Sequence, residues 1–272
     1  MSDVSYSTTA VRWGLLLVAL AVRPTLAHDT WVQAAPRQVR VGDVVHVDLF
    51  LGNHGNDHRD FKVAGKLGSL DGVTLDVLGP DSRRTDLVPD LVDLGYAPKE
   101  GFWSARFIPG AAGLHGIAHT RTGIHLGKRG IKSGKTYVVA AESLDEPPSA
   151  TAAHTEPLGH PLELVLESHP LLRAGPGREV AVRLVFRGAP LADHRVSFIP
   201  RGTTLAAGFD PEFERHTDAA GRCTFTPREG NLLLVVAHVD APEESGPDFK
   251  RTVYSATLVL DIPERCPCCD EP

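Results

Sequence analysis

The residues best suited to chemistry lie where a run of small residues ends, in the stretch RPTLAHDTWVQ at positions 23–33. If the chain is cleaved after Ala27, His28 becomes the first residue and carries a free α-amine beside its imidazole. These two nitrogens can chelate one metal ion, and such donors suit nickel, cobalt, copper and zinc. Few other sequence positions supply such a pair, so we expect His28 to be a metal ligand.

A glycine-rich stretch, GNHGNDHRDF, combines imidazole and carboxylate groups at His54, Asp57, His58 and Asp60. Donors of these two kinds suit borderline divalent metals, and a loop can turn them inward. The same residue types are also ordinary in solvated turns, so a polar loop without a metal is the alternative. We predict His54 and His58 as ligands.

Three more histidines lie in GLHGIAHTRTGIH, at His115, His119 and His125. In an extended strand His115, Ile117 and His119 would share one face, and His125 could join them across a turn. An exposed face with unrelated histidines is the alternative. His238 ends the apolar run NLLLVVAHVD, where it is either a residue at the rim of the core or a distant ligand. We predict His119, His125 and His238 as ligands.

The cysteines are placed unevenly, with Cys223 alone and Cys266, Cys268 and Cys269 in the terminal CPCCDEP. Three thiols could bind a soft metal, form local disulfides or stay reactive at a chain end. A closed tetrahedral site takes four ligands, and four late cysteines make no disulfide framework. Their role therefore stays open.

Residues 1–27 have the pattern of a secretory signal peptide. Arg12 supplies a positive flank, WGLLLVALAV follows at 13–22, and TLA offers small residues at a cleavage site. The apolar run is shorter than the ~20 residues of a membrane span, and an uncleaved anchor is the alternative. We expect cleavage between Ala27 and His28, and a periplasmic or secreted protein.

Composition limits the partners. Cleavage would leave 245 residues, of which 26 are basic and 33 are acidic. This length suits one large domain or two ordinary ones, and the acidic balance argues against nucleic-acid binding.

The elements that would position these residues are strands almost throughout. In RQVRVGDVVHVDLFLG, the side chains of Val45, Val47, Leu49 and Leu51 share one face. GPDS is expected to turn a hairpin, and SGKT to form a turn before the strand YVVAA. No long stretch shows capped helical periodicity, so we expect little helix.

A proline-rich stretch, SLDEPPSATAAHTEPLGHP at 143–161, has the composition of a linker. After it come seven short apolar runs separated by turn signals such as AGPG, DAAG and REGN, as in Ig-like sandwiches. We therefore expect an all-β chain with two β-sandwich, Ig-like domains at 28–145 and 161–263. A linker at 146–160 would join them, and a cysteine-rich tail would follow at 264–272.

Motifs of common enzymes are missing: there is no G-x-S-x-G, no phosphate-binding glycine loop and no H-E-x-x-H. We therefore expect a protein that is not an enzyme.

Several segments carry a family resemblance. AHDTW at 27–31 matches an AH-x-x-W start, and PLGHPLELVLESHPLLRAGPGREVAVRLVFRGAPL matches an entry into a second domain. HTDAAGRCTFTPREGNLLLVVAHV and YSATLVL match later strands. Over about 157–262 and 27–31, the chain resembles a periplasmic family described as a component of nickel/cobalt uptake systems with an additional Ig-like domain. The resemblance implies metal binding outside the cytoplasm and supports His28 and His238; the histidine-rich loops and the CPCC tail depart from it.

The leading hypothesis is thus an exported, non-catalytic carrier of a divalent transition metal that works beside a membrane transporter. Nickel or cobalt is favoured, with copper or zinc as alternatives. A copper enzyme with an N-terminal histidine brace is a second hypothesis, and Tyr254 is then the tyrosine to examine as its axial group. A purely structural or adhesive Ig-like module is the third. The sequence leaves the oligomeric state open.

Overall fold

The computed structural model describes residues 28–52, 70–95, 101–145, 155–172 and 174–265. Within these ranges the chain forms strands and one short 3-10 helix, η1 (Val88–Asp90), with no α-helix. The prediction of an all-β fold with little helix is therefore confirmed. No helix in these ranges is long and apolar enough to cross a membrane.

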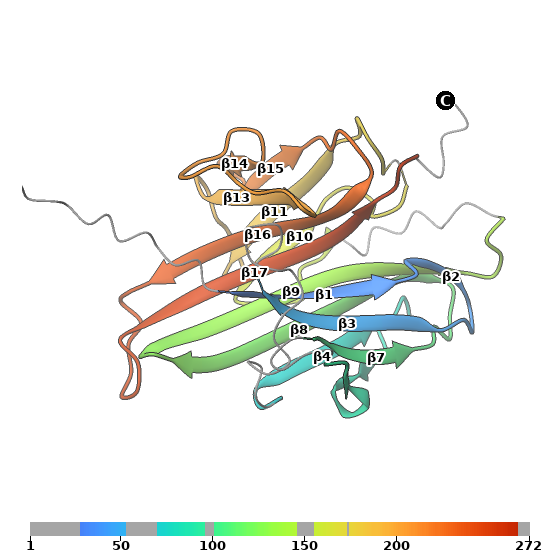
Figure 1. Ribbon diagram of the computed structural model, residues 1–272, viewed down its shortest axis with the longest axis horizontal. Coiled ribbons are helices and arrows are strands. Elements are labelled where there is room, and N and C mark those ends of the chain that lie inside the picture. Colours follow the sequence, from blue (N-terminus) through green and yellow to red (C-terminus); the bar gives the residue numbers. More distant parts are fainter. Residues whose placement is uncertain (1–27, 53–69, 96–100, 146–154, 173, 266–272) are drawn as a thin grey trace, which may run out of the picture.

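The strands of the described ranges make up three sheets (Figure 1). In chain order they are β1 (Asp29–Ala35), β2 (Gln38–Arg40), β3 (Val45–Gly52), β4 (Val73–Leu78), β5 (Arg84–Asp86), β6 (Val92–Asp93), β7 (Trp103–Phe107), β8 (Gly113–His125), β9 (Lys128–Ala141), β10 (Leu162–Leu166), β11 (Val180–Phe186), β12 (Ala189–Pro190), β13 (Arg195–Pro200), β14 (Glu214–His216), β15 (Arg222–Phe225), β16 (Asn231–Ala241) and β17 (Arg251–Ile262).

The largest sheet has nine strands and runs through both halves of the chain. Its order is β14-β13-β16-β17-β9-β8-β4-β5, and β2 also pairs with β9. The two halves join where β17 lies parallel to β9, in register from Arg251↔Lys128 to Leu258↔Lys135. The domain division at 146–160 stays a prediction, since residues 146–154 lie outside the described ranges.

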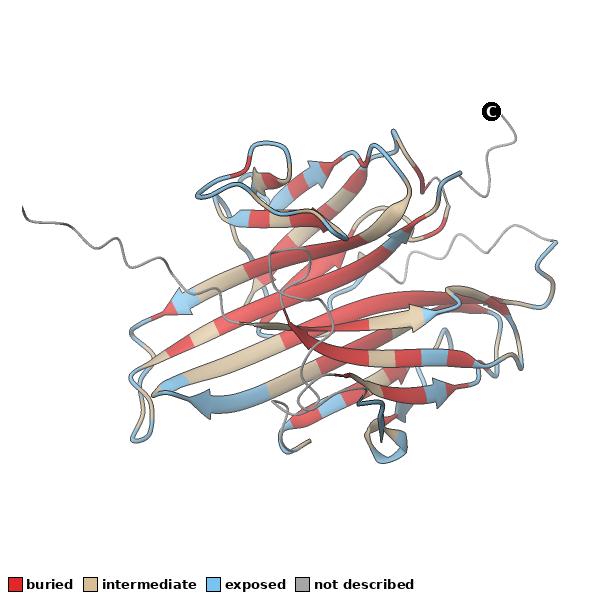
Figure 2. Cartoon of the chain, viewed as in Figure 1, coloured by how far each residue is buried: buried red, intermediate tan, exposed pale blue. Residues whose placement is uncertain are grey.

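The two smaller sheets cover opposite faces of the nine-stranded sheet. Neighbouring side chains of a strand point to opposite faces, and β9 shows both environments. Val138 and Ala140 pack with residues of β3 and β7, in the sheet of order β1-β3-β7-β6. Tyr137 and Val139 pack with residues of β10 and β11 on the other side. The sheet is therefore buried on both faces where the halves join (Figure 2).

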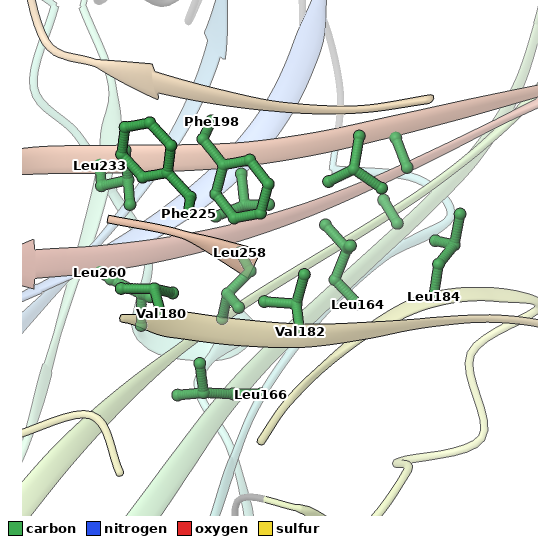
Figure 3. Packing of buried hydrophobic residues seen from close by; sticks show 14 of the residues in the cluster. Leu164, Leu166, Val180, Val182, Leu184, Phe198, Phe225, Leu233, Leu258 and Leu260 are labelled. Atoms are coloured by element: carbon green, nitrogen blue, oxygen red, sulfur yellow. The ribbon is translucent and has the colours of Figure 1, made fainter. Parts of the chain in front are cut away.

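The core of the second half lies between β10–β11 and the strands β13, β16 and β17. Leu164 and Leu184 contribute from one sheet and Leu258 from the other, and Phe198 stacks on Phe225 with ring centroids 5.1 Å apart (Figure 3). The two apolar faces bury each other, as expected for a sandwich.

A buried ion pair connects β9 to the start of the second half. Lys135 Nζ lies 2.7 Å from Glu163 Oε1, and the side chains are only 2% and 1% exposed. The same carboxylate accepts hydrogen bonds from the backbone N–H groups of Leu158, Gly159 and His160. Burial alone would raise the pKa of Glu163, but Lys135 and these donors hold it below its ordinary value. The pair thus fixes the entry into β10.

Local patterns gave mostly correct elements. The predicted GPDS turn is confirmed, because Ser82 N–H donates to the carbonyl of Gly79 between β4 and β5. The predicted turn at SGKT is wrong, because Ser133–Thr136 lie inside β9 and pair with β8. Gly134 is tolerated in that strand because β1 approaches it closely, as described below.

Candidate functional site

Strand β1 packs against β9 and β17 where the two halves join. The carbonyl of Thr30 accepts a hydrogen bond of 2.9 Å from Thr257 Oγ1. A Cβ atom added at Gly134 would lie 2.8 Å from Thr257 Oγ1 and 3.4 Å from the Cα of Trp31. The absence of a side chain at Gly134 therefore lets β1 approach, and this sets the position of its first residues.

A row of polar residues crosses four strands beneath the start of β1. His238 on β16 pairs with Ser255 on β17, and Ser255 pairs with Lys132 on β9. Lys132 pairs in turn with Arg121 on β8. Directly opposed residues of neighbouring strands lie on the same face. We call His238, Ser255, Lys132 and Arg121 the polar row.

Asp29, the first residue of β1, is bonded to one end of the polar row. His238 Nε2 donates to both carboxylate oxygens, at 2.9 and 3.1 Å, and Ser255 Oγ donates at 2.8 Å. Burial opposes the charged carboxylate, yet His238, Lys132 and Ser255 hold the pKa of Asp29 below its ordinary value. Burial likewise opposes a charged His238, but Asp29 raises its pKa. Asp29 and His238 therefore form a charge-assisted pair.

His28 is fixed from the same face. Lys132 Nζ donates to the backbone carbonyl of His28. Burial lowers the pKa of Lys132, while nearby Asp29 acts to raise it. Cleavage after Ala27 would therefore create the new α-amine one residue from an anchored carboxylate.

The structure brings His238 into contact with Asp29, the neighbour of His28, although His238 and Asp29 are 209 residues apart in the chain. The ring nitrogen Nε2 of His238 is occupied by Asp29. In this arrangement His238 orients the carboxylate, a role that hydrogen-bonding groups often play around metal ligands. A direct bond from this nitrogen to a metal would require the pair to open.

His119 lies on the face of the polar row and is fully buried. Its Nδ1 donates to the carbonyl of Thr74 at 2.9 Å, and its Nε2 lies 3.0 Å from Thr30 Oγ1. Burial lowers its pKa to about 3, which keeps the ring neutral. Because both nitrogens are engaged, a metal could bind only by displacing one partner.

The other histidines of β8 lie elsewhere. His115 is buried, and its Nε2 donates to the carbonyl of Ala111 at 3.0 Å. His125 is exposed at the end of the strand, opposite Lys128. Six residues of strand place His125 about 20 Å from His119, so these two histidines do not converge.

His54, His58 and the cysteines Cys266, Cys268 and Cys269 lie outside the described residues. The strands before and after 53–69 have known positions, since Gly52 pairs with Asp29 and Val73 pairs with Arg121. Gly52 and Val73 therefore lie at opposite ends of the region that holds the polar row. Cys223 is a core residue, and burial raises the pKa of its thiol to about 12.

No group of three or more His, Cys, Asp or Glu side chains within the described ranges is arranged to hold a metal ion. Cleavage after Ala27 would add a donor of another kind, the α-amine of His28.

Tyr254 points away from this site. Its hydroxyl donates to Glu244 at 2.8 Å, and its ring packs edge-on against Phe186 in the core of the second half. Its neighbour Ser255 faces Asp29, and successive strand residues face opposite ways. Tyr254 is thus on the wrong face to serve as an axial group at Asp29.

Sequence reasoning missed Asp29, Lys132 and Arg121. Asp29 could have been found from its position directly after the predicted first residue. Lys132 and Arg121 had no such signal, because they face the site only through the pairing of β8, β9 and β17.

A family model with the description "Domain of unknown function (DUF4198)" matches residues 25–240. No curated protein matches the chain. Among solved structures, the D0-D1 domain of intimin is 10% identical, with 85% of this chain and 97% of that one covered, at a TM-score of 0.24. The adhesin InvE of Yersinia pseudotuberculosis is 15% identical, with 86% and 59% covered and a TM-score of 0.23. A DUF4785 family protein of Legionella pneumophila is 11% identical, with 75% and 51% covered and a TM-score of 0.30. Likenesses this distant support no inference about function.

Proposed function

This chain belongs to the family described as Domain of unknown function (DUF4198), and from that premise we propose that it is an exported protein that binds a divalent transition metal at its mature N-terminus. Nickel or cobalt is favoured by the resemblance to nickel/cobalt uptake components, and copper or zinc are the alternatives. The task is binding and transfer of the metal, with a membrane transporter as the receiving partner.

One observation carries this proposal: Asp29 is anchored by His238 and Ser255, directly after His28. Cleavage after Ala27 would place an amine and an imidazole on the residue next to this anchored carboxylate. Nitrogen and carboxylate donors suit the metals named above. In this site His238 holds the carboxylate in place, while the remaining coordination positions stay available for exchange with a partner.

The test is titration of nickel, cobalt, copper and zinc into protein that begins at His28, into a form extended by one methionine, and into His28→Ala and Asp29→Asn. Extension converts the amine to an amide, so it should weaken binding at least tenfold, as should His28→Ala. His216→Ala is the matched control, since His216 is an exposed histidine that pairs with Asp193. Equal affinity of the extended form, His28→Ala and the authentic protein would refute the site.

Proton competition supplies a second test of the same site. The ordinary pKa is about 8 for an α-amine and about 6.5 for an imidazole. Both must lose a proton to bind a metal, so affinity should fall as the pH drops from about 7.5 to about 5.5. A constant affinity over that range would contradict the proposal.

A further inference from the structure

The charges around the polar row are unequal. Three of its side chains are basic: His238, Lys132 and Arg121. The anion bonded to the row is Asp29, which receives its hydrogen bonds from His238 and Ser255 at one end. The opposite end, at Arg121, has no carboxylate bonded to it among the described residues.

Arg121 differs in this respect from other arginines of the protein. Arg129 pairs with Glu244, and Arg183 pairs with Glu167. Arg121 is partly buried, and its Nε is buried without a hydrogen-bond partner within the described residues. An unpaired cation that is partly withdrawn from water is costly to keep.

The neighbour of Arg121 increases that cost. Lys132 lies directly opposite on β9, and like charges at opposed positions of a sheet destabilise it. Two cations therefore lie on the same face of the sheet, and among the described residues Asp29 is the anion bonded near them.

This charge surplus restricts which ligand can bind beside it. A bare metal dication at His28 would add to the repulsion from Lys132 and Arg121. A ligand that brings its own carboxylate would instead reduce it. The planar guanidinium of Arg121 matches a carboxylate with two parallel hydrogen bonds, and Lys132 adds a point charge.

We propose that Arg121 and Lys132 form an oxyanion subsite, so that the protein binds its metal as a complex with a small carboxylate chelator. This inference rests on the proposed function, because it names the form in which the metal arrives. The carboxylate contacts Arg121 and Lys132, while the metal is held by His28 and Asp29.

The experiment is equilibrium dialysis of the mature protein with radiolabelled citrate, with and without nickel. Wild-type protein should retain citrate in the presence of nickel, and Arg121→Gln should reduce that retention at least tenfold. Nickel affinity without citrate should rise rather than fall in the same variant, because the change removes a positive charge that repels the bare ion. Arg121→Lys should recover part of the retention, because it keeps the charge and loses the planar fork.

Arg106→Gln is the matched control, since Arg106 is an exposed arginine on β7, and it should retain citrate as the wild type does. Equal citrate retention by wild type and Arg121→Gln, or nickel binding without retained citrate, would overturn the subsite. If the protein retains inorganic phosphate as tightly as citrate, and does so without nickel, then the subsite binds a free anion. The proposal of a bound metal–chelator complex would then be wrong. If no form binds nickel while citrate retention still requires Arg121, the metal proposal fails and the oxyanion subsite stands.

Discussion

Removal of either partner of the Lys135–Glu163 ion pair should destabilise the whole fold. The pair is almost completely buried, at 2% and 1% exposure, and it links β9 to the segment that enters β10. Breaking a buried pair leaves an uncompensated charge and costs about 3–5 kcal/mol. This is a large share of the ~5–15 kcal/mol by which a folded domain is stable.

The contacts of the two partners indicate which variant suffers more. In Lys135→Met, Glu163 keeps its three backbone N–H donors, so the loss should lie near the lower limit, about 3 kcal/mol. Glu163→Gln leaves Lys135 without its carboxylate and turns an amide NH₂ toward backbone donors, so about 4–5 kcal/mol is expected. The double variant should lose at least about 2 kcal/mol less than the sum, because no unpaired charge remains.

Urea unfolding of the mature protein, followed by the fluorescence of Trp31 and Trp103, measures all three values. Arg228→Gln is the control: it removes an ion pair of similar length, 2.7 Å, whose partners are 83% and 47% exposed. Such a surface pair contributes little, so the variant should unfold with the wild type. Losses under about 1 kcal/mol in both single variants, or strictly additive losses, would refute the reasoning.

Three further predictions concern the site and the junction of the halves. The pKa of His119 is lowered from 6.5 to about 3 in the folded protein. As the pH falls, this histidine therefore gains its proton in the unfolded chain first. The free energy of unfolding should decrease below pH 6.5, by about 2 kcal/mol at pH 5. His119→Gln should reduce the difference in urea stability between pH 7.5 and pH 5 by about that amount, and an unchanged difference would argue against a neutral buried ring. Gly134→Val should displace β1 and lower both the melting temperature and metal affinity, whereas Gly123→Ala, where an added Cβ meets nothing within 4 Å, should not; equal melting temperatures would contradict the close approach. Brief digestion with elastase should cut first within 145–157, and the fragments should still elute together because β9 and β17 are hydrogen-bonded; early cuts within NLLLVVAHV would count against this.

Local patterns in the sequence were sufficient for most strands, but not for β9, whose residues Ser133–Thr136 were predicted as a turn. The alternation at Val45, Val47, Leu49 and Leu51 correctly gave the buried face of β3, where all four side chains are buried. The GPDS turn was equally readable, because turn residues act through their own backbone preferences. Period-two alternation and turn chemistry involve neighbours in the chain, so they need no knowledge of the rest of the fold.

The composition of the site required the tertiary structure. The sequence indicated His28, from the residues before it, and the resemblance supported His238. It gave no sign that Asp29 would hold His238, or that Lys132 and Arg121 would lie beside them. These contacts depend on the parallel register of β17 on β9 and on the approach of β1 over Gly134. A strand pattern specifies which side chains share a face, but it does not specify which distant strand lies alongside; that choice is made by the packing of the three sheets together.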